Sequence, residues 1–157
     1  MDTDKVNRWL TLGANLGVLV GIILLVVELE QNREMIRAQT RNEIAAEIVD
    51  LLSQVATSNE LSSLLTRAAS GESLSDEDQR QFGHRAMAMF RYFENVHYQY
   101  RQGMYDEEEY QAQRDAWRHN GGFLSNPAYK SVWCAWRETF SVEFRTEYES
   151  LFDNLVC

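Results

Sequence analysis

A glutamate and a histidine three residues apart, Glu94 and His97, are the first candidates for chemistry in this sequence. A Glu and a His at this spacing on one helix form half of the ligand set of ferritin-like di-iron bundles. Such a site needs a second copy and two further carboxylates, and the sequence contains no second Glu-x-x-His. His97 also falls on an apolar helix face, where a hydrogen-bonded core histidine is the competing interpretation. Glu94 and His97 therefore stay as metal-site candidates, and we expect no cofactor.

Nucleophilic catalysis has no recognisable motif here. The sequence has no Gly-x-Ser-x-Gly and no glycine-rich phosphate loop, and neither Cys134 nor Cys157 stands beside a histidine in a known signature. Cys134 lies between two tryptophans, which indicates packing, and the two thiols could pair without forming a disulfide framework. The acidic run 106–109 is interpreted as a solvated helix start. We assign no catalytic residue and expect a protein that is not an enzyme.

The stretch Trp9–Val27 is the element around which the sequence is organised, because its 19 residues carry no charge. At ~1.5 Å per residue it is about 28 Å long, close to the ~30 Å of a bilayer's hydrocarbon core. A cleaved signal peptide would have a shorter apolar core and a small-residue cleavage site, whereas here the apolar run leads directly into Glu28. A buried core helix would carry a polar side. The sequence therefore predicts a transmembrane helix over 9–27 after a short head, 1–8.

Three glycines in this span, Gly13, Gly17 and Gly21, follow one another at four-residue steps. Small residues at this spacing let two membrane helices approach closely, although glycine is also common in membrane helices generally. We expect a helix–helix interface on this face. Thr11 and Asn15 lie four residues apart on another face, and Asn15 in hydrocarbon would seek a hydrogen bond across a helix–helix interface. In an alternative interpretation, Asn15 faces the lumen of an oligomeric pore.

Lysines and arginines near the span predict its orientation. Two of them precede it, Lys5 and Arg8, and three follow it, Arg33, Arg37 and Arg41. The count favours a cytoplasmic domain after the span, with the short head translocated.

The spanning helix is expected to continue beyond the membrane, because neither glycine nor proline occurs between Gly21 and Gly71. An unbroken helix to about Ala56 would be ~75 Å long at ~1.5 Å per residue. Its external part has an apolar stripe that needs a partner surface: Ile36, Ile44, Ile48, Leu51, Leu52 and Val55.

Capping residues and glycines divide the rest of the chain into helices. We expect helices over about 60–69, from Ser75 to Gly103, over about 106–119 with Gly121-Gly122 as its stop, and from Pro127 onward. At Ser141 the chain either kinks into a final helix or continues straight. The expected apolar faces are Phe82, Ala86, Met89, Phe90, Phe93, Val96, His97 and Tyr100; Tyr110 and Trp117; Tyr129, Val132, Trp133, Trp136 and Phe140; and Phe144, Tyr148, Leu151, Phe152 and Leu155.

The predicted fold is all-α: one N-terminal transmembrane helix, continuous with a long extramembrane helix, and then a small helical bundle. The extramembrane domain, 28–157, is long enough for one modest core. The formal net charge of −9 and the pI near 4.8 argue against nucleic acid as a partner, since phosphate binding needs a concentrated basic face.

Three segments carry a resemblance: Val27-Glu28-Leu29-Glu30-Gln31-Asn32, Arg91-Tyr92-Phe93-Glu94-Asn95, and the stretch from Trp133 to Arg145. Together with the span, they make the sequence similar to a broad group of uncharacterised bacterial proteins. These have one N-terminal membrane helix, a Gln-Asn pair just after it and a small Trp-rich helical domain. The resemblance covers most of the chain through loose motifs. It implies a bacterial inner-membrane location and a single-pass topology, and it gives no residue a catalytic role.

The leading functional hypothesis is a membrane-anchored, self-associating helical protein with a scaffold or regulatory role. The alternatives are an oligomeric pore lined by the single spans and a metal-binding helical protein that uses Glu94 and His97. The expected partners are the lipid bilayer and further copies of the same chain. The sequence does not identify any other protein partner.

Overall fold

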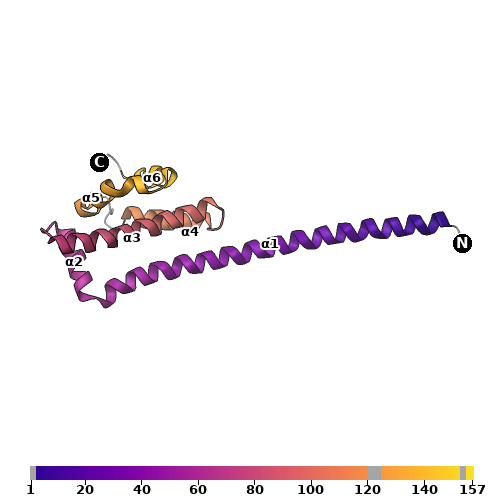
Figure 1. Cartoon of the computed structure of the whole chain (residues 1–157), viewed down its shortest axis with the longest axis horizontal. Helices are drawn as coiled ribbons and strands as arrows, with labels where there is room; N and C mark the ends of the chain where they lie inside the picture. The colour runs from indigo at the N-terminus through magenta and orange to yellow at the C-terminus, as the bar shows by residue number, and fades with distance from the viewer. Residues whose placement is uncertain (1–2, 120–124, 153–154) are drawn as a thin grey trace. The chain divides into compact units, whose positions relative to one another are not determined.

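The computed structural model describes residues 3–119, 125–152 and 155–157, and every regular element in these ranges is helical. A long apolar N-terminal helix, α1 (Thr3–Thr57), is followed by five shorter packed α-helices (Figure 1). The all-α prediction is therefore confirmed. So is the prediction that the apolar stretch belongs to a much longer helix, since α1 has 55 residues without a break.

The chain forms two compact units, which divide within α1 between Gln39 and Thr40. The first unit is the N-terminal part of α1. The second contains the last turns of α1 and all the shorter helices. One side of these last turns is buried against the rest of the second unit, with Thr40, Ile44 and Leu51 at most 9% exposed. The inner part of the predicted stripe thus has its partner surface.

Two short helices follow the caps expected from the sequence. The hydroxyl of Ser58 accepts a hydrogen bond from the Leu61 amide at the start of α2 (Asn59–Ser70), and Gly71 ends the helix in the left-handed conformation at φ 75°. Later in the chain, the Asn126 side chain accepts from the Ala128 amide at the start of α5 (Pro127–Trp136). The Ser58 and Asn126 caps each satisfy a main-chain amide that the start of a helix leaves without a partner.

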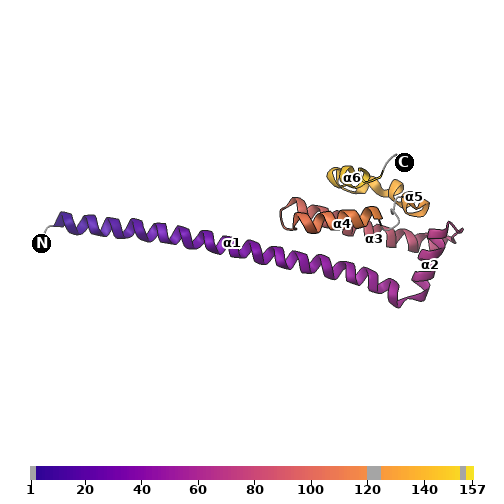
Figure 2. The ribbon, with the colours of Figure 1, turned by 180° about the vertical axis from the view of Figure 1, so that it is seen from behind.

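The second unit is arranged around α3 (Asp76–Arg101), which contacts α2, α4 (Glu107–His119), α5 and α6 (Val142–Glu149). In both views α3 and α4 run side by side, with α5 and α6 along another side of α3 (Figures 1 and 2). The Ser75 hydroxyl caps α3 by accepting from the Asp78 amide. Arg67, which donates to the Asp78 side chain at 3.1 Å, lowers the pKa of that carboxyl and joins α2 to α3.

The core is a cluster of aromatic rings contributed by α3, α4, α5 and α6. The largest fully buried side chains are those of Trp117, Trp133, Tyr92, Tyr148, Phe90 and Phe144. Trp133 and Tyr148 pack edge to face with ring centroids 4.9 Å apart. Such aromatic pairs contribute about 0.5–1.5 kcal/mol beyond their buried area. The expected core positions Tyr110 and Trp117 are buried, while the expected stop at Gly121-Gly122 lies outside the described residues.

The helical chain is interrupted before Ser141. A short 3₁₀ turn, η2 (Arg137–Thr139), follows α5, and the extended backbone of Phe140 separates it from α6, which Ser141 caps. The chain therefore breaks rather than continuing straight. The helix ends at Glu149, earlier than the apolar spacing suggests, and Leu151, Phe152 and Leu155 pack against the core from beyond its end.

Candidate functional site

The apolar stretch of α1 is exposed along its whole length in the single chain. Trp9 is 73% exposed, and the large apolar residues that follow it up to Val27 lie between 47% and 65%. This is the one helix among the described residues that is long and apolar enough to cross a membrane. Its side chains have no cover from the rest of the described chain, so they require either lipid or another protein surface.

The predicted glycine face lies open on this stretch. A Cβ placed on Gly13, Gly17 or Gly21 would meet no atom within 4 Å, apart from the neighbouring backbone of the helix itself. Asn15 lies on another face with Asn7 and Thr11, at four-residue steps, beside a hollow of about 490 Å³. The Thr11 hydroxyl donates to the main-chain oxygen of Asn7 at 2.9 Å. The N-terminal part of α1 therefore carries one face of small residues and one polar face.

Glu94 makes hydrogen bonds that hold the C-terminal helix. One carboxylate oxygen accepts from the main-chain amide of Ser141 at 2.8 Å, and the other pairs with Arg91 at 2.6 Å. Arg91 also donates to Thr139 and lies 4.2 Å above the ring of Phe140. These contacts join the middle of α3 to the start of α6.

His97 lies one turn further along α3 and is 6% exposed. Its ring centroid is 6.2 Å from that of Tyr110 and 5.8 Å from that of Phe144. Burial in this aromatic surrounding lowers the pKa of His97 below its ordinary value. In the described part of the chain, no group of three His, Cys, Asp or Glu side chains is placed to hold a metal ion. The contacts found for Glu94 and His97 are those of structural residues.

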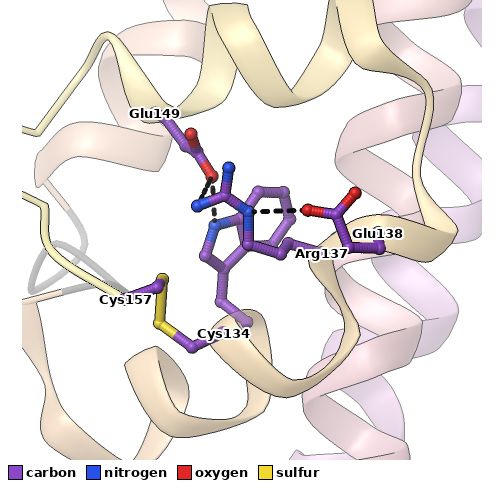
Figure 3. Close-up of a disulfide and its surroundings, with 6 residues drawn as sticks. Cys134, Arg137, Glu138, Glu149 and Cys157 are labelled. Atoms are coloured by element: carbon purple, nitrogen blue, oxygen red, sulfur yellow. Dashed lines mark hydrogen bonds and ion pairs between the residues drawn. A yellow bond between two sulfur atoms is a disulfide. The ribbon is translucent and has the colours of Figure 1, made fainter.

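Cys134 and Cys157 form a disulfide, with their Cα atoms 5.3 Å apart (Figure 3). Cys134 also packs against the hydrophobic core, as the sequence indicated. The pairing, which the sequence left open, forms because the fold brings Cys157 onto α5. Nearby, Glu149 of α6 accepts a hydrogen bond from the indole of Trp133 at 3.0 Å and pairs with Arg137 at 3.2 Å. The disulfide and these polar contacts together join α5, η2 and the end of the chain.

Sequence reasoning did not find a furrow between α3 and α5. A cavity of about 710 Å³ there is lined by Asp76, Gln79, Arg80, Gly83, His84 and Met87 on one side and by Ser131, Val132, Ala135 and Trp136 on the other. A second cavity of about 360 Å³ shares Gln79, Ser131 and Val132 with it, and we call the two cavities together the α3–α5 furrow. The indole of Trp136 remains 54% exposed.

Gly83 was the sequence signal that could have indicated this furrow. It lies inside α3, where glycine costs about 0.5–1 kcal/mol relative to alanine. Its backbone has no positive φ, and a Cβ added there would meet no atom within 4 Å. Neither turn geometry nor close packing therefore calls for a glycine, and its effect is to leave space in the furrow.

Comparison with protein families, with curated proteins and with solved structures gives no match for this chain.

Proposed function

We propose that this protein is a membrane-anchored helical module that self-associates through α1 and serves as a scaffold or regulatory unit. The observation that carries the proposal is the uncovered apolar stretch of α1, whose open glycine face runs through Gly13, Gly17 and Gly21. In lipid, helices associate chiefly by close packing over small residues. A second copy of the span supplies a surface of the same shape.

A second exposed stripe on α1 supports the same arrangement outside the membrane. Its members recur at alternating steps of three and four residues, as in a coiled-coil seam: Met35, Ala38, Asn42, Ala45, Val49, Leu52 and Ala56. Val49 and Leu52 are 59% and 58% exposed. The same two heptad positions, extended toward the N-terminus in steps of seven residues from Met35 and Ala38, include Gly21 and Gly17. A single polar residue such as Asn42 in a seam of this kind favours a defined register between two parallel helices.

The size of the protein in a mild detergent tests self-association. We expect wild type to be an oligomer by light scattering or native mass measurement. Gly17→Ile should weaken it, because a bulky side chain separates backbones that otherwise touch. Leu19→Ile, on the opposite side of the helix, is the matched control and should leave the oligomer intact. A wild-type monomer rejects the proposal.

The polar line Asn7, Thr11 and Asn15 favours a second candidate, an oligomeric pore lined by the spans. Purified protein in liposomes would then conduct ions, and Asn15→Leu would reduce the flux while leaving the oligomer size unchanged. Absence of flux from liposomes that contain the oligomer leaves the scaffold role as the better account.

The location we propose is the bacterial inner membrane, with one span, as the resemblance to bacterial single-span proteins implies. Two observations bear on the side that the domain faces. The count of basic residues, three after the span and two before it, favours the cytoplasm. The disulfide favours the oxidising side, because disulfides are rare in a reducing cytosol. A difference of one basic residue is the weaker of the two, so we propose that the domain faces the periplasm.

Protease added to intact spheroplasts distinguishes the two orientations. Digestion of the domain supports the periplasmic placement. A domain that stays protected until the membrane is permeabilised would instead support the cytoplasmic orientation that the basic residues favour.

A further inference from the structure

The furrow between α3 and α5 has the dimensions of a small-molecule site. Its larger cavity, about 710 Å³, falls within the ~300–1,000 Å³ that such pockets occupy. The second cavity extends it toward the start of α3, where Leu74 and Phe82 contribute to the lining.

The walls of the larger cavity are mainly apolar. Met87 on α3 faces the space together with Val132, Ala135 and Trp136 from the α5 side. The exposed indole of Trp136 offers a flat apolar surface with a polar edge. A ligand with an apolar body would remove this surface from water, which is the main favourable term in binding an apolar group.

Arg80 and His84 bring two basic side chains to the same cavity, one helical turn apart. Neither has an ion pair or hydrogen bond with any other described residue, whereas Arg67, Arg91 and Arg114 are all paired. Two acidic side chains also belong to the lining: Asp76 lines the larger cavity one helical turn before Arg80, and Glu72 lines the second cavity. In a chain of net charge −9, an unpaired arginine beside an apolar cavity is a site for an anionic group.

We propose that the α3–α5 furrow binds a single-chain anionic amphiphile, with its charged head at Arg80 and His84 and its chain against Met87, Val132 and Trp136. The space left by Gly83 is where this chain passes between the helices. A free fatty acid and an anionic lysophospholipid such as a lysophosphatidate share this chemistry. The site does not depend on self-association of α1.

The test uses the full chain in phosphatidylcholine nanodiscs, labelled with 5-fluorotryptophan, and sodium decanoate as the probe. The fluorine resonance of Trp136 is identified by its loss in Trp136→Phe. We expect decanoate to shift this resonance in a saturable manner and to leave those of the buried Trp117 and Trp133 unchanged. Decyltrimethylammonium has the same chain with the opposite charge, and it should not produce a saturable shift.

Variants locate the site. Gly83→Leu should abolish the shift by filling the furrow, whereas Gln81→Leu places the same side chain on an exposed position of α3 and should preserve it. Arg80→Gln combined with His84→Gln should weaken decanoate binding at least tenfold. A lysophosphatidate probe of equal chain length then distinguishes phosphate from carboxylate heads.

The proposal is overturned if wild type shows no saturable shift, if both probes act equally, or if Gly83→Leu binds as wild type does. The comparison of decanoate with decyltrimethylammonium needs only the wild-type protein, so it tests the proposal even if a variant fails to fold.

Discussion

Arg85, near the middle of α3, donates a hydrogen bond from its guanidinium to the main-chain oxygen of Leu51 in α1. A second nitrogen of the same group lies 3.4 Å from the side-chain oxygen of Gln54. Arg85 is only 9% exposed, and burial lowers its pKa from the ordinary value. A buried cation needs such partners. The last turns of α1 are thus an integral part of the helical domain.

The boundary of the folded domain follows from this contact. A fragment of residues 40–157 should fold without the anchor, with a strongly helical circular dichroism spectrum and one cooperative melting transition. A fragment of residues 58–157 lacks Leu51 and the buried Ile44, so it should lose that cooperativity. A random-coil spectrum for 40–157 at neutral pH would mean that the core depends on the membrane or on assembly.

Removal of the guanidinium should destabilise the domain. We expect Arg85→Ala to lower the free energy of unfolding of fragment 40–157 by about 2 kcal/mol, the usual scale for a hydrogen bond to a charged group. Urea denaturation measures the change. Arg80→Ala, on the exposed side of the same helix, is the control and should change stability by less than about 0.5 kcal/mol. Equal effects of the two substitutions would contradict the role given to Arg85.

Glu94 is expected to act as a cap rather than as a metal ligand. Glu94→Gln keeps the size of the side chain but removes the charge that attracts Arg91 and strengthens the bond from the Ser141 amide. We expect a loss of about 1–2 kcal/mol. Melting with and without Zn²⁺ or Fe²⁺ provides the second measurement. A large metal-induced rise in melting temperature that Glu94→Gln abolishes would restore the metal hypothesis.

His97 should make stability decrease as the pH falls below about 6.5, the ordinary histidine value. Because its pKa is lowered in the folded state, the unfolded chain binds a proton more readily than the folded one. The contribution of neutral His97 is therefore complete above about pH 6.5, the ordinary histidine value, and is lost as the pH falls through the folded-state pKa. Urea midpoints at pH 7.5 and 5.5 measure this loss. His97→Phe should reduce the difference, and an unchanged difference would assign it to other groups.

Local signals explain why so much of the fold was predictable. The cap at Ser75, the proline at the start of α5 and the left-handed Gly71 each act within a few residues. Apolar periodicity likewise identified the buried face of α3, including Phe90 and Val96. These signals determine where a helix begins, where it ends and which side it buries.

Contacts between distant residues were not predictable from spacing. Nothing near Cys134 in the sequence indicates that Cys157 lies beside it, and the apolar face of α3 does not reveal that Arg85 meets the carbonyl of Leu51. The furrow depends on how α3 and α5 pack, so Gly83 alone could only suggest open space. Likewise, α6 ends at Glu149 although apolar residues follow at helical spacing, because these residues reach the core from a non-helical segment.

The central claim, that two copies of α1 meet along one face, is tested most directly by cysteine cross-linking in native membranes. Single substitutions Gly17→Cys, Val49→Cys and Leu19→Cys are made in the full chain, whose own two cysteines are paired with each other. After oxidation with copper phenanthroline, non-reducing electrophoresis should show dimers for Gly17→Cys and Val49→Cys and little or none for Leu19→Cys. Equal cross-linking at all three positions, or none at Gly17→Cys, would contradict the account.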